Sequence, residues 1–352
     1  MRINKLFLTV SIVLALSLLL GACAPAPTPA PAAPATEAPV KKVKVLLLTE
    51  DPIGVNPYFI TASEGLKKAA QDLGIETKVI ESNGDATNMD ENLRAAARED
   101  YNLIILMTFG FNDTLRLVAP TTPDKFYVCV DCGVDLTGLT NVRDVGFKSH
   151  EAAYLLGIAA ARLSKTGTIG GVGPVEMPFM QRWLIPFYQG AKTVKPDIKT
   201  LDTLWVGSWA DPAKAKELAL TLSGKGADVI NGTAAAGNPG IFEAAKEKNF
   251  ITTGVDVNEC PKAPGLLIDS VVKRVDLVVY NSIKDFLGKT LKPGAVELGI
   301  KDGGVDLAVF AWPDTKTQCI LQDKPDILKE VGDARQKIIS GEIQVADPMT
   351  AK

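Results

Sequence analysis

The chain has 352 residues and a formal net charge of −3. A charge this close to zero excludes the dense basic surface on which nucleic-acid binding depends. The residues beyond position 42 are more than one hydrophobic core usually organises, so we predict two lobes.

The first segment of the chain has the pattern of an export signal. Arg2 and Lys5 precede an apolar stretch that ends at Leu20, and small residues come before Cys23. That order is typical of a cleaved signal, and Leu-Gly-Ala-Cys resembles a bacterial lipobox, in which the cysteine is lipidated and becomes the new N-terminus. We predict a lipoprotein signal peptide over residues 1–22; the alternative is an uncleaved anchor helix. Both place the protein at the bacterial cell membrane, on its extracytoplasmic face.

Residues 23–42 read as the lipidated cysteine and a tether. The stretch is rich in alanine and proline, and prolines at this density prevent helix and favour an extended, solvated chain. Such a tether reaches about 3 Å per residue, so it holds a domain off the membrane without supplying chemistry.

From Val43 onward the sequence alternates strands with helices. Val43 to Thr49 is a continuous apolar run, as a strand buried on both faces requires. A helix with one apolar face follows and ends at Gly74, and the next strand is ETKVIES. This order repeats as far as about Leu287, which predicts parallel sheets with helices on both faces.

The same order also appears twice on a larger scale. The stretch that ends at Asp131 and the stretch that ends at Asp256 each read as strand, glycine-bearing loop, helix and strand. This duplication predicts two similar α/β lobes. Because ligands bind beyond the carboxyl ends of parallel strands, facing lobes direct both aspartates and their neighbouring loops into one cleft.

Two dipeptides mark expected helix starts beside this cleft. Asp211-Pro212 and Asn238-Pro239 each place a capping side chain before a proline at the first helical position. Both helices come directly after a strand and a loop, so we expect their positive ends to face the cleft.

Catalytic motifs are absent from the sequence. It contains no G-x-S-x-G elbow, no P-loop and no HExxH. His150, the one histidine, falls near an expected helix start, where we interpret it as a surface or interface residue. We therefore predict no enzyme activity, no metal and no cofactor.

Four cysteines lie beyond Cys23. In an exported chain one or two disulfides are expected, but the sequence does not determine their pairing. A Cys-x-x-Cys spacing also suits a redox or zinc site; because there is no second such pair and one histidine, we favour a disulfide or buried thiols. The four are Cys129, Cys132, Cys260 and Cys319.

Polar and aromatic residues concentrate in the loops that follow expected strands. A flat ligand can lie between such rings; the alternative is that they pack in the core or the hinge. The residues are Asn56, Tyr58 and Phe59 after the first strand, Phe109 and Phe111 after LIILMT, and Trp209 after LWVGS.

Two charged residues lie in apolar surroundings. Asp256 closes the strand FITTGVD, where its carboxylate can accept hydrogen bonds from two hydroxyl groups of a sugar; a loop cap is the alternative. Lys273 lies within GLLIDSVVKRVDLVVY and is either a cation of the cleft or a solvated helix residue.

Nearly all of the chain after the tether resembles the basic-membrane-protein family of bacterial substrate-binding lipoproteins, which includes purine nucleoside receptors. The resemblance implies a type I periplasmic-binding-protein fold, in which two Rossmann-like α/β lobes with parallel sheets are joined by a three-crossing hinge. We expect lobe 1 over residues 43–147 and 276–312 and lobe 2 over residues 148–275 and 313–352. The stretches that carry the resemblance are EAAYLLGIAAARLSKTGTIGGVG, VGSWADPAKAKELA, GKGADVING, TTGVDVNECPKAPGLLIDSVVKRVDLVVY and GIKDGGVDLAVF.

The resemblance also assigns roles to residues of the cleft. Asp256, which closes GVD, and Lys273, within SVVKRVD, look like the ribose-binding groups of the nucleoside receptors. Trp209 of GSW, with Phe109 and Phe111 of FGF, looks like the set of base-stacking residues, and Asp131 of CVD matches a further site position.

One departure concerns the base contacts. Nucleoside receptors usually carry an Asp-Lys-Ser-Phe-Asn-like stretch in the first loop, where this chain has Asn56-Pro57-Tyr58-Phe59. In addition, VEMPFMQRW and GSWADPAK look closer to a sister branch that includes purine-base binders.

The expected function is that of a lipid-anchored receptor of an ATP-binding-cassette importer, which binds a purine nucleoside between its lobes. Alternative ligands are a free purine base and a sugar-like solute. A sensor subunit is an alternative role, and a nucleoside-processing enzyme is disfavoured because no aspartate cluster for a metal is visible. The expected partners are the small-molecule ligand, the permease subunits and the membrane; we expect a monomer that does not bind nucleic acid.

Overall fold

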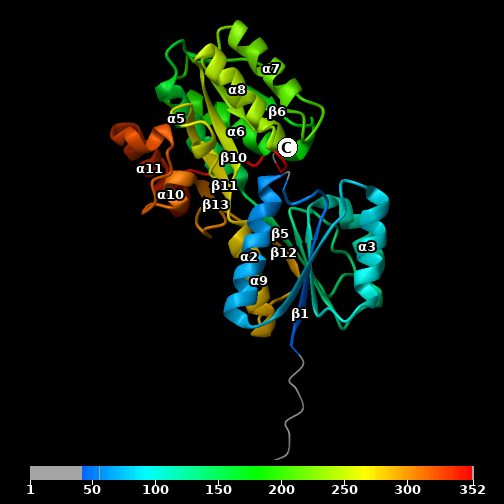
Figure 1. Cartoon of the computed structure of the whole chain (residues 1–352). Coiled ribbons are helices and arrows are strands. Elements are labelled where there is room, and N and C mark those ends of the chain that lie inside the picture. Colours follow the sequence, from blue (N-terminus) through cyan, green and yellow to red (C-terminus); the bar gives the residue numbers. More distant parts are fainter. Residues whose placement is uncertain (1–41, 55, 351–352) are drawn as a thin grey trace, which may run out of the picture. The chain divides into compact units, whose positions relative to one another are not determined.

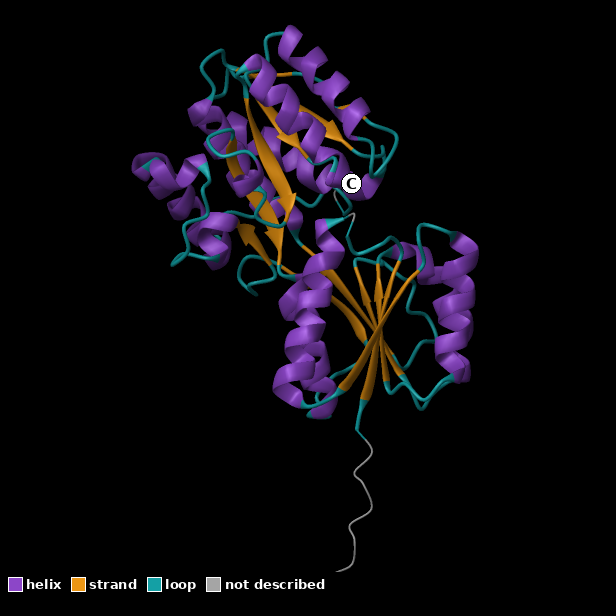
Figure 2. Ribbon diagram, viewed as in Figure 1, coloured by secondary structure: helices purple, strands orange, loops and turns teal. Residues whose placement is uncertain are grey.

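The computed structural model describes residues 42–54 and 56–350. This part of the chain forms two α/β lobes, each built on its own twisted sheet (Figures 1 and 2). The predicted signal peptide, Cys23 and nearly all of the tether lie outside the described residues.

The first lobe contains a sheet of six parallel strands. In pairing order these are β12 (Gly294–Leu298), β5 (Val142–Phe147), β4 (Phe126–Val130), β3 (Leu103–Met107), β1 (Lys44–Thr49) and β2 (Glu76–Glu81), and the helices are α2 (Pro57–Leu73), α3 (Ala86–Arg98), α4 (Asn112–Val118) and α9 (Val275–Leu287). Successive residues of a strand point to opposite faces. Val45 and Leu47 pack with α2 and α9, whereas Leu46 and Leu48 pack with α3 and α4. The continuous apolar run of β1 therefore reflects a sheet covered on both faces, as predicted (Figure 1).

The second lobe contains a sheet of seven strands, parallel except for β13. Its main path is β13 (Val305–Leu307), β11 (Leu267–Lys273), β10 (Ile251–Asp256), β9 (Val229–Gly232), β6 (Thr168–Gly173) and β7 (Lys199–Thr200), with β8 (Leu204–Trp205) also paired to β6; the helices are α5 (Ser149–Leu163), α6 (Gln181–Val194), α7 (Pro212–Gly224), α8 (Asn238–Lys248), α10 (Ala308–Ala311) and α11 (Pro325–Ser340). Two adjacent glycines of β6 show how the helices are layered. A side chain at Gly170 would meet Leu222 of α7, and one at Gly171 would meet Leu184 of α6. Helices α6 and α7 therefore cover opposite faces of this sheet.

Three crossings connect the lobes. They run from β5 into α5, from β11 into α9, and from β12 into β13. Arg182 of α6 contacts several of these connecting segments. Its guanidinium donates to the Phe147 carbonyl at 3.1 Å, to Glu297 at 3.2 Å and to Asp347 at 2.6 Å. One buried cation thus ties two crossings and the C-terminal segment to the second lobe.

The boundaries of the lobes differ from expectation in one place. Residues 276–312 were assigned to the first lobe, but β13 pairs antiparallel with β11, so the last crossing comes between Leu298 and Val305. All strands were expected to be parallel. A short edge strand has no sequence pattern that shows whether it pairs in the parallel or the antiparallel sense.

The two expected helix starts differ in outcome. Asp211 caps α7 as predicted, because its carboxylate accepts the Lys214 amide at 2.9 Å. Asn238 is instead the first residue of α8, and its side chain accepts the Ala234 amide and donates to Glu259. It therefore braces the preceding loop rather than capping the helix.

His150 is the second residue of α5 and is buried, not on the surface. Burial lowers the pKa of its imidazole to about 4. Within residues 42–54 and 56–350, every helix is too short or too polar to cross a lipid bilayer.

Candidate functional site

A cleft lined by both lobes holds most of the predicted site residues. The space between its lining atoms is about 660 Å³, including the open mouth. The predicted residues that line it are Asn56, Tyr58, Phe59, Phe109, Asp131, Trp209, Asp256 and Lys273. Eight of the nine predicted positions thus come together from loops that are far apart in sequence.

Strained backbone marks the strand ends at this cleft. Thr108 follows β3, Asp131 follows β4, and Asp256 ends β10; their φ angles are +75°, +57° and +65°. Ala235, in the loop after β9, has φ +52°. A residue other than glycine in this region costs about 1–3 kcal/mol, and such residues cluster at functional sites. All four line the cleft, which favours a binding role for these loops.

Among the described residues, Lys273 is the only cation that lines the cleft. It is the last residue of β11, so it lies on a strand and not on a solvated helix, and its side chain is 4 % exposed. The ammonium group lies 2.5 Å from Asp131 Oδ2 and 3.8 Å from Asp256 Oδ1. The Tyr58 hydroxyl donates to the same Asp131 oxygen at 3.0 Å. The charge of Lys273 is therefore held between two carboxylates.

Aromatic rings surround the same ammonium group. Its nitrogen is 4.5 Å from the ring centre of Trp183, 5.2 Å from those of Tyr58 and Phe179, and 5.4 Å from that of Phe147. Ring faces are electron-rich, so they stabilise a cation that has lost its water. The cage fixes the position of the lysine and leaves its donors directed at a small set of acceptors.

The carboxyl groups of the cleft are shifted by their surroundings. Burial raises the pKa of Asp256 to about 6, and the ammonium of Lys273 opposes this rise. Burial also raises the pKa of Glu50 and that of Asp51, both of which follow β1. The described residues that line the cleft therefore include four carboxyl groups and one ammonium group, and burial raises the pKa of three of the carboxyl groups.

Phe111 is the predicted site residue that lies elsewhere. Phe109 to Phe111 forms a 3-10 turn, and its two rings point in different directions. Phe109 is 40 % exposed and lines the cleft, whereas Phe111 is fully buried in the core beneath α3 and α4. The assignment of Phe111 to ligand stacking is therefore wrong.

Nine of the residues that line the cleft were not predicted from the sequence, and three of them come from one segment. Phe179, Met180 and Trp183 follow β6, in the segment VEMPFMQRW. The internal repeat contained the signal, because this segment occupies in the second lobe the place that Asn56, Tyr58 and Phe59 occupy in the first.

Trp183 adds an unused donor to the cleft. The residue is 3 % exposed, and its indole Nε1 finds no hydrogen-bond partner among the described residues. Buried N–H groups are nearly always paired, so an unpaired one in a cleft calls for an explanation. A ligand acceptor is the simplest partner for it.

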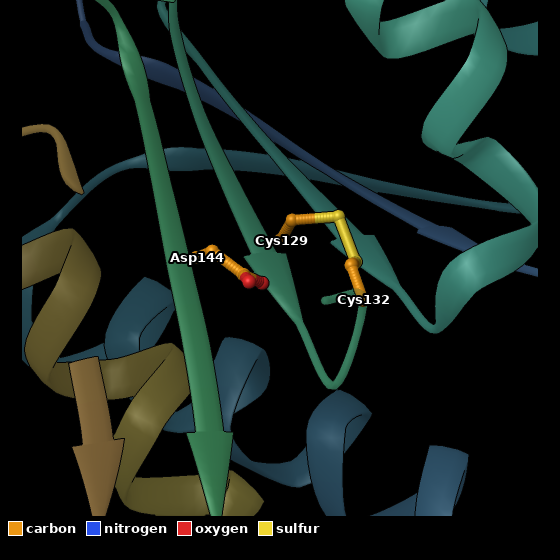
Figure 3. Close-up of side chains that lie close together, drawn as sticks. All are labelled: Cys129, Cys132 and Asp144. Atoms are coloured by element: carbon orange, nitrogen blue, oxygen red, sulfur yellow. A yellow bond between two sulfur atoms is a disulfide. The ribbon is translucent and has the colours of Figure 1, made fainter. Parts of the chain in front are cut away.

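Both pairs of cysteines form disulfides, Cys129 with Cys132 and Cys260 with Cys319. Each bridge lies close to a buried carboxyl group: Asp144 beside the first, as Figure 3 shows, and Asp269 beside the second. Metals bind thiolates rather than disulfide sulfurs, so neither cluster is a metal centre in this form. The first bridge flanks Asp131 directly.

The chemistry of the cleft suits an uncharged ligand rich in donors. Carboxylates accept hydrogen bonds and cannot donate them when ionised, and the described lining contains four carboxyl groups beside one ammonium group. Hydroxyl and amino groups supply the matching donors, and the rings supply flat apolar surface. A phosphate would add negative charge beside these carboxyl groups.

The chain is similar to several known proteins. The sequence model of a family described as "ABC transporter substrate-binding protein PnrA-like" matches residues 42–348. The ABC transporter nucleoside-binding protein BmpA of Lactococcus lactis is 30 % identical, over 88 % of this chain and 91 % of that protein. A purine-binding protein of Brucella abortus is 26 % identical, over 86 % and 83 % of the two chains. The crystal structure of an ABC transporter solute-binding protein of Aeropyrum pernix superposes with a TM-score of 0.76 at 28 % identity, over 87 % and 94 %.

Proposed function

Because the chain belongs to the Bmp family of PnrA-like substrate-binding proteins of ABC transporters, we propose that it captures a purine nucleoside in the cleft between its lobes. It is a solute-binding protein of the type I periplasmic-binding-protein fold and not an enzyme. The observation that carries the choice of ligand is the arrangement of Asp131, Lys273 and Asp256 beside the aromatic rings.

The sugar of the nucleoside is held by the charged groups. Asp256 is partly buried at the end of β10, and within the described part of the chain Lys273 is the one donor group near its carboxylate. Two ribose hydroxyls satisfy such a carboxylate, while Lys273 donates to a ribose oxygen. A hydrogen bond to a charged group contributes about 1.5–3 kcal/mol, so this part of the ligand supplies a large share of the affinity.

The base is held by rings from both lobes. Phe109 comes from the first lobe, and Phe179 and Trp209 come from the second. Stacking on either side of a purine ties the lobes together only when ligand is present. The free indole N–H of Trp183 is available to an acceptor atom of the ligand.

Charge excludes the phosphorylated forms of the same ligand. A nucleoside monophosphate would bring its phosphate close to carboxyl groups that already outnumber the single ammonium group. Like charges in a partly desolvated cleft repel strongly. We therefore expect nucleosides to bind and nucleotides to bind weakly or not at all.

A ligand screen tests this function. Adenosine, guanosine, inosine, their free bases, ribose and adenosine monophosphate are added separately to the purified protein, and its thermal unfolding is recorded. A ligand at 100 times its dissociation constant adds about 2.7 kcal/mol of stability. Stabilisation by a nucleoside supports the proposal. Stabilisation by a base alone or by a sugar alone selects one of the alternative ligands instead.

The protein is anchored to the cell membrane through Cys23, which lies outside the described residues. The support comes from the Leu-Gly-Ala-Cys segment and from a relative of Pyrococcus abyssi named as a lipoprotein, 30 % identical over 90 % of this chain. Cys23→Ala is expected to leave an unprocessed precursor in the producing cell. A mature-length protein from that variant would contradict lipidation.

The role of the receptor is delivery of its ligand to a permease. Receptors of this kind close their lobes about a hinge, and a monomer suffices for that motion. Solution scattering with and without nucleoside is expected to show a smaller radius of gyration at saturation, and an unchanged radius would count against closure. A gene neighbourhood with a permease and an ATPase supports transport, whereas a neighbouring membrane kinase supports the alternative role in sensing.

A further inference from the structure

The Cys129–Cys132 disulfide encloses the residue that pairs with Lys273. Cys129 lies within β4, where it is paired with Leu106 of β3 and Asp144 of β5. Cys132 lies just beyond the strand, and Asp131 stands between the two. Figure 3 shows the bridge at the point where the chain leaves β4. Both cysteines are buried, and of residues 129–132 it is Asp131 that lines the cleft.

The backbone at this bridge turns sharply. Asp131 has φ +57° and Gly133 has φ +61°, so left-handed residues lie on both sides of Cys132. The Asp131 amide donates to the Val145 carbonyl at 2.8 Å, which fixes its backbone while the carboxylate points into the cleft. A non-glycine residue keeps such a conformation only when its surroundings hold it there.

The far side of the turn is held by neighbours of the bridge. The carboxyl group of Asp144 lies beside the backbone amides of Gly133 and Val134, which oppose the rise of its pKa on burial. The carbonyl of Cys132 accepts the Asn112 amide group at 2.9 Å. The Asp131 and Asp144 contacts hold the turn against β5, and the disulfide is the side-chain link that ties it back to β4.

We propose that the Cys129–Cys132 disulfide positions the Asp131 carboxylate for ligand binding; this inference rests on the proposed function of the cleft. Bonded sulfurs lie about 2 Å apart, whereas non-bonded heavy atoms keep about 3.5–4 Å. Cys129 is fixed by strands on both sides, so the separation on loss of the bond falls to Cys132. Asp131 is its direct neighbour and moves with it.

A shift of this size breaks the contacts of Asp131. Its Oδ2 atom lies 2.5 Å from the Lys273 ammonium and 3.0 Å from the Tyr58 hydroxyl. An added ångström or more takes both beyond the range of a hydrogen bond. Lys273 then pairs with Asp256 alone. The carboxylate oxygens that accept hydrogen bonds from the ligand no longer lie at the positions that the ligand needs.

The other disulfide is the matched control. Cys260 and Cys319 are also buried, but neither is the direct chain neighbour of a residue that lines the cleft, whereas Cys132 follows Asp131. They stand 59 positions apart, whereas Cys129 and Cys132 stand three apart. A cross-link restrains the unfolded chain more when it closes a longer loop. The Cys260–Cys319 bridge is therefore expected to stabilise the fold more, whereas the Cys129–Cys132 bridge restrains only the turn that contains Asp131.

The test is a double-mutant cycle measured by titration calorimetry. The probe is whichever of adenosine, guanosine and inosine the parent binds most tightly. Cys129→Ser/Cys132→Ser is made in the parent and in Asp131→Asn, because asparagine tolerates the left-handed conformation. We expect the serine pair to weaken binding at least about tenfold in the parent and less than about twofold in Asp131→Asn, since coupled residues are non-additive. Equal losses in both backgrounds would overturn the inference, as would a loss in Cys260→Ser/Cys319→Ser as large as in Cys129→Ser/Cys132→Ser.

A readout without ligand separates this inference from the proposed function. The crystal structure of Cys129→Ser/Cys132→Ser is expected to show Asp131 outside the left-handed region and its carboxylate more than 4 Å from Lys273. An unchanged Asp131 overturns the inference whatever the ligand is. If the parent binds no nucleoside, the proposed function fails, and the crystal structure still decides whether the bridge positions Asp131.

Discussion

The ammonium group of Lys273, at the end of β11 in the second lobe, lies 2.5 Å from the Oδ2 atom of Asp131, which follows β4 in the first lobe. The two residues are 142 positions apart and their side chains are both at least 95 % buried. Removing two charges from water costs about as much as their attraction returns. A pair of this kind adds little to stability, so its place in the cleft is better explained by ligand binding.

Loss of the cation is expected to destabilise the protein strongly. Lys273→Met keeps the length of the side chain but leaves Asp131 and Asp256 without a counter-charge. Removing one partner of a buried pair costs about 3–5 kcal/mol, which urea unfolding of the ligand-free variant will measure. The control is Lys329→Met, whose partner Asp333 lies in an exposed pair on α11, and which we expect to change little. Equal stability of Lys273→Met and the parent would show that the pair is not buried as described.

Nucleoside affinity is expected to fall in acid. Burial raises the pKa of Asp256 to about 6, and only its ionised form accepts two hydroxyl hydrogen bonds. The affinity is then constant above neutral pH and drops about tenfold between pH 7 and pH 5. Calorimetry across this range measures the drop, and Asp256→Asn is expected to remove most of it. A profile that is flat in the parent, or equally steep in the variant, would assign the ligand contact to other groups.

The two disulfides are expected to contribute unequally to stability. In the chain-entropy account a bridge across 59 positions contributes about 4 kcal/mol and one across three positions about 2 kcal/mol. Chemical unfolding of Cys260→Ser/Cys319→Ser should therefore show the larger loss. For nucleoside affinity we expect the reverse: Cys129→Ser/Cys132→Ser should show the larger loss. A larger loss of stability from Cys129→Ser/Cys132→Ser would mean that the short bridge supports the whole first lobe.

Stability is expected to fall as pH rises through the acid range. Asp269 is fully buried, one of its oxygens has no hydrogen-bond partner in the described part of the chain, and burial raises the pKa of its carboxyl to about 7. The folded state therefore binds this proton more tightly than the unfolded state, whose pKa is near 3.9. The contribution is fully present below about pH 4 and is lost by about pH 7, to a total of about 4 kcal/mol.

Asp269→Asn tests this pH dependence. The variant cannot ionise at this position. Its free energy of unfolding should therefore fall less between pH 5 and pH 8 than that of the parent. The amide oxygen keeps the acceptor for the Ala308 amide, which lies 2.9 Å from the carboxylate. Urea unfolding at the two pH values gives the comparison, and parallel pH curves for parent and variant would contradict the assignment.

The sequence was a good guide to strands and to their order. Continuous apolar runs such as that of β1 are characteristic of a sheet covered on both faces. The aspartate that follows β4 and the one that ends β10 were found because strand ends in parallel sheets meet at one edge. The duplication of the strand–helix pattern then placed Asp131 and Asp256 in one cleft. These inferences needed only the local alternation of strands and helices and the right-handed connection that parallel strands share.

Other features depend on geometry that the sequence does not display. Phe109 and Phe111 look equivalent in the sequence, and only the 3-10 turn directs one ring to the cleft and the other to the core. The apolar run around Lys273 continues from strand into helix without a breaker, so the sequence left its environment open. Disulfide pairing requires distances between chain segments, and four cysteines allow three pairings.

The most direct measurement of the central claim is calorimetry of Asp256→Ala with a purine nucleoside and with the corresponding free base. Asp256 accepts from the sugar, so loss of one charged hydrogen bond or two is expected to weaken nucleoside binding by about ten- to a few hundred-fold. Binding of the free base, which lacks the sugar, is expected to change far less, and far-ultraviolet circular dichroism should show an intact fold. If the variant binds the nucleoside as tightly as the parent does, the cleft does not hold a nucleoside by its sugar.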